Sequence, residues 1–171
     1  GYMSNVGYED VRQAVAENLN RRFSTDFSAE NIIMTVGAAG GLNVILKTLL
    51  NPGDEVIVFA PYFAEYGNYV MNYDGTLVVV SPDTETFQLG LQEFAEKITP
   101  RTKAVILNNP NNPTGVSIPR EDMEWVAGVC RKQGVRLVVD ECFCDFLDAP
   151  GACSLIPLLE KYPNVFVLKA F

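Results

Sequence analysis

The sequence of 171 residues contains no histidine. This absence excludes Ser-His-Asp and Cys-His catalysis, and it also excludes any metal site built on imidazole ligands. Chemistry in this chain would therefore have to come from carboxylates, amides, lysines or a bound cofactor.

Cysteine is scarce, and its spacing does not match a metal or redox motif. None of the four cysteines forms the paired CxxC pattern of zinc or dithiol sites, and they stand at Cys130, Cys142, Cys144 and Cys153. We predict reduced thiols within the core and no metal site.

Basic residues are outnumbered by acidic ones, 13 to 21, which gives a net charge of −8. An acidic surface disfavours nucleic acid and anionic membranes as partners. No apolar run is long enough to span a membrane, and no signal-peptide pattern is present, although the chain opens at Gly1. We therefore expect a cytoplasmic protein, and 48% hydrophobic residues suffice for one domain with a sizeable core.

Short apolar runs alternate with helical patterns along the chain. The predicted strands are 32–36, 55–59, 76–80, 104–107, 135–139 and 165–168. The predicted helices are 9–22, 42–50, the residues after Phe63 up to about 71, 89–98, 118–133 and 154–162. This alternation predicts an α/β fold with a mainly parallel sheet and helices on both faces.

A polar loop follows the predicted strand 104–107, in the sequence VILNNPNNPTGV. Ligands of open α/β sheets bind beyond the carboxyl ends of the strands, so this loop is a candidate site wall. Pro110 and Pro113 fix two backbone angles and bias Asn109 and Asn112 toward extended conformations. The alternative is a tight turn built from ordinary turn formers.

Two further features could contact a charged ligand. Asp140 ends the apolar run 135–139, where a carboxylate is costly without a partner, unless it caps the next segment. The sequence GAAGG, from Gly37, stands between a predicted strand and a predicted helix, where backbone N–H groups can bind phosphate. Close helix packing or a Rossmann-type turn would explain GAAGG equally well, although the GxGxxG pattern is absent.

The loop NNPNNPTG after an apolar strand resembles the Asn-Pro-Thr-Gly loop of the fold-type I, pyridoxal-phosphate-dependent aminotransferases of class I/II. Within them it looks most like the histidinol-phosphate aminotransferase and threonine-phosphate decarboxylase branch. The resemblance covers nearly all of residues 1–171 and implies a truncated large, cofactor-binding domain. The last, antiparallel strand of that domain and the small C-terminal domain would then be absent, and the implied cofactor is pyridoxal 5'-phosphate.

The resemblance implies a role for each matching residue. Asp140 would pair with the pyridine nitrogen, and Asn112 would donate a hydrogen bond to the phenolic oxygen. Ala38, Ala39 and Gly40 would bind the cofactor phosphate. Phe63 would stack on one face of the pyridine ring, and Cys142 would pack against the opposite face.

Two positions qualify the resemblance. Phe143 stands where the family usually has a tyrosine that also bonds the phenolic oxygen, so one donor is missing and we expect a raised imine pKa. Tyr2 matches a tyrosine that reaches the partner's cofactor phosphate across a homodimer interface, although a disordered terminus is the alternative.

The Schiff-base lysine is not among the 171 residues under this alignment. Lys169 occupies an earlier basic position of the related pattern, and the Schiff-base lysine would follow two residues after Phe171, so no catalytic residue is present. In the family the missing antiparallel strand separates the first strand, here 32–36, from the strand 165–168. We therefore expect the first strand to lack its sheet neighbour, which leaves a gap or a position for a second copy.

The resemblance implies transfer of an amino group between an amino acid and a 2-oxo acid. The nearest alternative is a decarboxylase of the threonine-phosphate type on the same scaffold. From other classes, a non-catalytic domain fragment and a dinucleotide-binding oxidoreductase also remain open.

Overall fold

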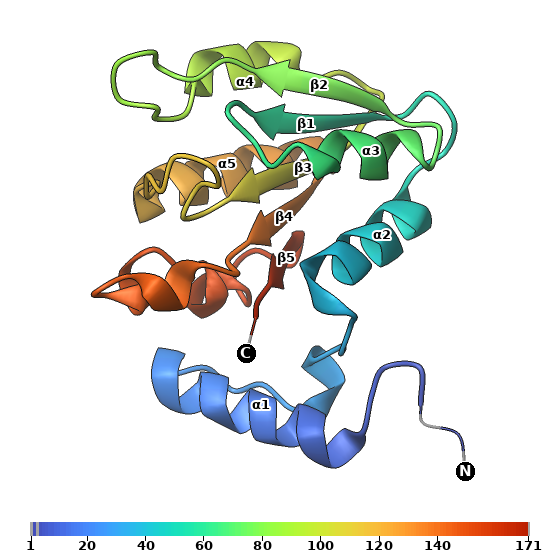
Figure 1. The fold of residues 1–171 in the computed structure, drawn as a ribbon, viewed down its shortest axis with the longest axis vertical. Helices are drawn as coiled ribbons and strands as arrows, with labels where there is room; N and C mark the ends of the chain where they lie inside the picture. Colours follow the sequence, from blue (N-terminus) through green and yellow to red (C-terminus); the bar gives the residue numbers. More distant parts are fainter. Residues whose placement is uncertain (1, 3, 171) are drawn as a thin grey trace.

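The computed structural model describes residues 2 and 4–170, and these contain a parallel sheet with the strand order β2-β1-β3-β4-β5 (Figure 1). The strands are β1 (Glu55–Phe59), β2 (Thr76–Val80), β3 (Thr102–Asn108), β4 (Arg136–Asp140) and β5 (Val165–Leu168). Every pair of neighbouring strands is parallel, which confirms the predicted sheet type. The predicted strands at 55–59, 76–80 and 165–168 have the observed bounds.

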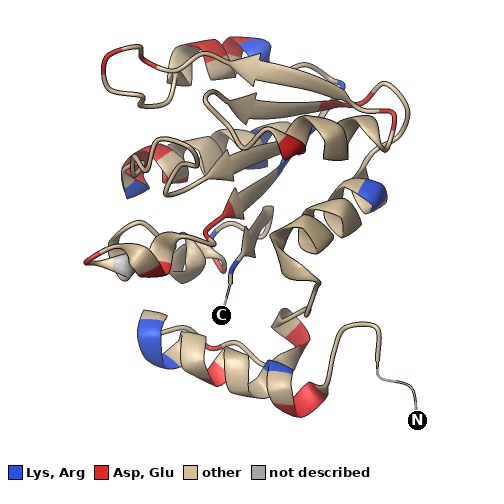
Figure 2. Cartoon of the chain, viewed as in Figure 1, with Lys and Arg blue, Asp and Glu red and all other residues tan. Residues whose placement is uncertain are grey.

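Five α-helices lie within the described residues, in the order α1 (Glu9–Phe23), α2 (Gly37–Leu49), α3 (Glu65–Met71), α4 (Leu91–Lys97) and α5 (Arg120–Gln133). Short 3-10 helices follow at η1 (Ala29–Asn31), η2 (Cys144–Phe146), η3 (Pro150–Ala152) and η4 (Ile156–Leu158). Helix α1 begins with Glu9 and Asp10 and ends with Arg21 and Arg22 (Figure 2). Those charges complement the helix dipole at both ends.

Alternate residues of each strand face opposite sides of the sheet, and each side is covered by helices. In β1, Val56 and Val58 belong to one hydrophobic cluster, whereas Ile57 and Phe59 belong to the other. The first cluster contains side chains of α2 and α3, namely Leu42, Leu46, Tyr66 and Val70. The second contains side chains of α4 and α5, namely Phe94, Met123, Val126, Ala127 and Cys130. The expectation of helices on both faces is confirmed.

The predicted strand 32–36 does not form, and the sheet is continuous without it. A strand needs a neighbouring strand for its backbone hydrogen bonds. Here the N–H of Met34 donates instead to a loop residue, the carbonyl of Val6, over 3.0 Å. Ile33 and Val36 are 63% and 93% exposed. The segment lacks a strand neighbour, as the sequence predicts, but the prediction that it forms a strand is wrong.

The predicted helix 154–162 is reduced to the single 3-10 turn η4. Pro157 lies inside this segment and disfavours the α conformation of the residue before it, which opposes a regular helix that begins at 154. In addition, the hydroxyl of Ser154 and the N–H of Leu155 donate to the carboxylate of Glu141 over 2.6 and 2.8 Å. These contacts hold the start of the segment against Glu141. The turn then closes through i to i−3 bonds, from the N–H of Leu158 to Leu155 over 2.9 Å and from that of Leu159 to Ile156 over 3.3 Å.

The four cysteines are thiols, as predicted, and three of them are buried while Cys142 is half-buried. None of the helices in the described part of the chain is sufficiently long and apolar to cross a membrane.

Candidate active site

Asp140 ends β4 with its carboxylate buried and doubly hydrogen-bonded. The phenol of Tyr66, on α3, donates to Oδ2 over 2.8 Å, and the N–H of Cys142 donates to Oδ1 over 3.2 Å. Burial, together with the adjacent Asp140 charge, raises the pKa of Tyr66 above its usual range, so the phenol remains a donor. The carboxylate is therefore held in a fixed orientation at the carboxyl edge of the sheet.

Residues 109–115, which follow β3, form the Asn-Pro loop. It is tied to the same strand end through Asn108, which pairs in register with Asp140. The side-chain amide of Asn108 donates to the carbonyl of Asp140 over 3.1 Å. Its side-chain oxygen accepts from the N–H of Asn112 over 2.6 Å. Asn108 thus fixes the backbone of Asn112 relative to Asp140.

Asn111 connects the loop to the segment before α3. Its side-chain amide donates to the carbonyl of Pro61 over 2.7 Å, and its side-chain oxygen accepts from the hydroxyl of Thr114 over 2.7 Å. Phe63, two residues after Pro61, packs edge-to-face on Tyr66 with ring centroids 5.7 Å apart. Its ring is 39% exposed, so part of it is accessible to a ligand.

Cys142 and Phe143 follow Asp140 along the chain. Burial, with a contribution from Asp140, raises the pKa of the Cys142 thiol to about 12, so this thiol is protonated at neutral pH. Phe143 is 44% exposed, and its ring centroid lies 6.1 Å from that of Phe146. These two rings and Leu147 line a mostly apolar hollow of about 330 Å³. Its other wall is the Asn-Pro loop, at Pro110, Asn111, Asn112, Pro113 and Gly115.

Helix α2 brings its first turn to the same edge of the sheet. The helix begins at Gly37 itself, where φ is +66°, so Ala38 and Ala39 lie in the first turn. The N–H groups of a first turn have no acceptor within their own helix. A Cβ at Gly41 would lie 2.8 Å from Cδ2 of Leu168, and Leu168 pairs in register with Asp140. The helix start is therefore one strand away from Asp140.

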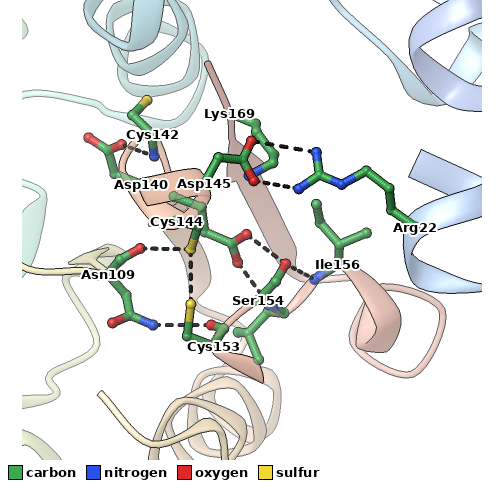
Figure 3. Close-up of polar contacts among 12 residues, drawn as sticks. Arg22, Asn109, Asp140, Cys142, Cys144, Asp145, Cys153, Ser154, Ile156 and Lys169 are labelled. Carbon is green, nitrogen blue, oxygen red and sulfur yellow. Dashed lines mark hydrogen bonds and ion pairs between the residues drawn. The ribbon is translucent and has the colours of Figure 1, made fainter. Parts of the chain in front are cut away.

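The structure also places Tyr2 and Lys169, which the sequence singles out. Tyr2 is fully exposed near the N-terminus. The side chain of Lys169 is 5% exposed, and its Nζ forms an ion pair with Oδ1 of Asp145 over 3.3 Å. Asp145 also pairs with Arg22 of α1 (Figure 3).

Sequence reasoning did not find Tyr66 and Asn108. Tyr66 stands on the apolar side of a helical pattern, and a buried phenol usually has a hydrogen-bond partner, which was the available signal. Asn108 could have been noticed as an amide that ends an apolar strand. Neither signal identifies the partner, because Asp140 is far from both residues in the sequence.

The convergence of a buried carboxylate, an amide-rich loop and a helix start at the carboxyl edge of a parallel sheet defines an α/β enzyme domain with a ligand site. The sequence profile of the family "Aminotransferase class I and II" matches residues 1–171, and the chain belongs to this family. Members of the family use pyridoxal 5'-phosphate.

Named relatives agree with this assignment. The chain is 30% identical to the aspartate aminotransferase of Thermotoga maritima over 171 residues, which cover 99% of this chain and 45% of that protein. It is 34% identical to a probable aspartate/prephenate aminotransferase of Aquifex aeolicus over 143 residues, 83% of this chain and 36% of that protein.

A solved structure of a Thermus thermophilus aspartate aminotransferase double mutant superposes with a TM-score of 0.90 and 32% identity. The match covers 99% of this chain and 44% of that chain. The chain therefore spans less than half the length of these relatives.

Proposed function

We propose that the protein to which this chain belongs transfers an amino group between an amino acid and a 2-oxo acid, with pyridoxal 5'-phosphate bound at the carboxyl edge of the sheet. The observation that carries the proposal is the convergence of Asp140, the Asn-Pro loop and the first turn of α2 in a member of this family. When bound, the cofactor supplies an electron sink for the carbanion at the substrate α-carbon.

Asp140 fits the role of partner to the protonated pyridine nitrogen. Its carboxylate is buried, and a charge in such a place is stabilised by an opposite charge. Each carboxylate oxygen can accept more than one hydrogen bond, so the donors Tyr66 and Cys142 leave capacity for another. Those two donors orient the carboxylate, while Asp140 would hold the proton on the ring nitrogen.

The remaining residues fit the other parts of the cofactor. The first-turn N–H groups of Ala38, Ala39 and Gly40 would bind the phosphate, because a helix start attracts anions. Gly40 contributes less, since its N–H already donates to the carbonyl of Val36 over 3.2 Å. Asn112 would donate to the phenolic oxygen. Phe63 would stack on one face of the pyridine ring, and Cys142 would pack against the opposite face.

Phe143 bears no hydroxyl and cannot supply a second donor to the phenolic oxygen. We propose that Asn112 is therefore the main donor from this part of the chain. The raised imine pKa expected from the sequence remains a prediction.

The proposal also concerns the extent of the large domain and the lysine that bonds the cofactor covalently. Residues 1–171 would be the first part of the large domain, and the small domain would lie outside them. The ion pair of Lys169, whose side chain is buried, with the exposed Asp145 supports the view that a different lysine bonds the cofactor covalently. The homodimer with a role for Tyr2, and the cytoplasmic location, remain predictions.

The names of the relatives favour transamination over decarboxylation. Those reported above are aspartate and aspartate/prephenate aminotransferases, and another, from Pseudomonas aeruginosa, is an arginine–pyruvate transaminase. They lend no support to the histidinol-phosphate branch that the sequence suggested. Aspartate is consequently the amino donor to assay first.

Titration of the 171-residue chain with pyridoxal phosphate, followed by cofactor absorbance, tests the site. We expect Asp140→Asn to weaken binding by about 10- to 100-fold, because it removes a charged hydrogen-bond acceptor from the ring nitrogen. Asp148→Asn is the matched control, since Asp148 is exposed eight residues further along, and it should leave the affinity unchanged. Equal affinities for wild type and Asp140→Asn would contradict the assignment.

Borohydride reduction of the same mixture, with peptide mapping, tests the role of Lys169. We expect no lysine to be labelled stoichiometrically. Stoichiometric labelling of Lys169 alone would show that the alignment of the last strand is wrong and that this chain carries its own covalent lysine.

A further inference from the structure

Cys144 and Cys153 lie against one another beneath the Asn-Pro loop (Figure 3). Their sulfur atoms are 3.2 Å apart, and the residues are 0% and 6% exposed. Cys144 begins η2, while Cys153 directly follows η3. The start of η2 and the end of η3 thus place two thiols against each other in the interior.

The pair is connected to the loop through Asn109. The thiol of Cys144 donates to the carbonyl of Asn109 over 3.3 Å. The side-chain amide of Asn109 donates to the carbonyl of Cys153 over 3.1 Å, and its side-chain oxygen accepts from the N–H of Ile118 over 2.8 Å. Both cysteines are therefore held in place by the residue that opens the Asn-Pro loop.

We propose that Cys144 and Cys153 are a modification site that closes reversibly to a disulfide bond in the presence of a peroxide. A disulfide has an S–S length of about 2.05 Å, so the sulfur atoms need to approach by about 1.2 Å from their 3.2 Å separation. The segment between them contains only the 3-10 turns η2 and η3, whose backbone can adjust more readily than a long helix. This inference is independent of the proposed cofactor chemistry.

The reaction balances with hydrogen peroxide as the oxidant. The Cys153 thiol loses its proton and attacks one peroxide oxygen, which gives a sulfenic acid and water. The Cys144 sulfur then attacks the sulfenic sulfur, the S–S bond forms, and a second water leaves. A dithiol reductant reverses the reaction by thiol–disulfide exchange.

The surroundings of the pair predict a slow reaction. Burial, and then the nearby Glu141 carboxylate, raise the pKa of the Cys144 thiol above its usual range. Because the thiolate is the reactive form, oxidation should accelerate as the pH rises. The half-buried Cys142 is the competing partner, since it lies only two residues from Cys144.

The test is oxidation of the 171-residue chain with hydrogen peroxide, then alkylation of the remaining thiols under denaturing conditions. Cleavage before aspartate places Cys144 in the peptide 140–144 and Cys153 in a peptide that begins at Asp148. We expect these peptides to be linked, to separate on reduction with dithiothreitol, and to leave two alkylated thiols in the oxidised chain.

Variants identify the partners, because Cys142 and Cys144 share one peptide. The link should form in Cys142→Ser and in the distant control Cys130→Ser, and it should be lost in Cys144→Ala and Cys153→Ala. Alkylation of all four thiols in the oxidised wild type would overturn the proposal. A link that persists in Cys144→Ala but is lost in Cys142→Ser would also overturn it, since Cys142 would then be the partner.

Discussion

The orientation of Asp140 depends on a single phenol from another element. Tyr66→Phe removes the donor to Oδ2, and it leaves a buried carboxylate oxygen without that hydrogen bond. We expect the variant to lose about 1–3 kcal/mol of unfolding free energy. Urea denaturation measures this loss, and Tyr69→Phe, on the same helix but half-buried, is the matched control with a smaller effect. Equal stabilities for the two variants would contradict a supporting role for Tyr66.

Glu141 should make the stability of the chain depend on pH. Its carboxyl group is fully buried, and burial raises its pKa despite the donors Ser154 and Leu155. Between the ordinary glutamate pKa and this higher folded value, the folded state holds the proton more strongly than the unfolded state. Stability therefore falls as the pH rises through that window, by up to about 1.4 kcal/mol per pH unit.

Glu141→Gln removes the titrating group and can keep both hydrogen bonds, because an amide oxygen accepts from Leu155 and an amide N–H donates to Ser154. We expect its urea midpoint to vary less with pH above 4.5 than that of the wild type. Glu160→Gln, at an exposed position, should retain the wild-type dependence. A wild-type slope in Glu141→Gln would show that another group is responsible.

At the scale of elements, the contact of α2 with β5 positions the start of the helix. Gly41→Ala would place a methyl group 2.8 Å from Cδ2 of Leu168, at the end of a half-buried side chain that can shift. We therefore expect the cost of this close contact to cancel the gain of about 1 kcal/mol from helix propensity. At Gly40 the nearest atom to an added Cβ is 3.5 Å away. Gly40→Ala should therefore gain up to about 1 kcal/mol from helix propensity. Thermal unfolding compares the two, and a stabilised Gly41→Ala would contradict the close packing.

The elements that the sequence predicts well are those with local signals. Strands β1, β2 and β5 are short apolar runs between turn residues, and their bounds follow from that pattern. The segment 32–36 has the same pattern, but a strand also requires a neighbour, which a local pattern does not reveal. The segment 154–162 does not form a regular helix because of Pro157 and the distant carboxylate of Glu141.

The candidate site likewise combines residues that a local sequence pattern predicts with residues that only the fold brings together. The placement of Asp140 and Asn112 at this edge of the sheet could be predicted, because Asp140 ends an apolar run and Asn112 follows another. Their contacts with the cofactor stay predictions. Tyr66 and Asn108 act through contacts across 74 and 32 residues, which only the fold creates. The Cys144 and Cys153 pair likewise depends on how η2 and η3 return the chain on itself.

At the scale of the whole molecule, β5 is an open edge. Within the described residues it pairs only with β4, so its other side presents backbone groups without a strand partner. Phe166 on this strand is 40% exposed, and apolar Ile33 and Val36 are more exposed still. An exposed edge strand with apolar side chains is a template for pairing with another chain.

We therefore expect the 171-residue chain to self-associate as its concentration rises, with β5 as the contact. Phe166→Lys adds a charge on the edge strand, and it should shift the chain toward monomer in sedimentation equilibrium. Met71→Lys makes the same charge change at a residue of α3 that is 62% exposed, and it should leave the association unchanged. If both variants associate as the wild type does, then the contact lies on another surface and the β5 edge is protected in solution.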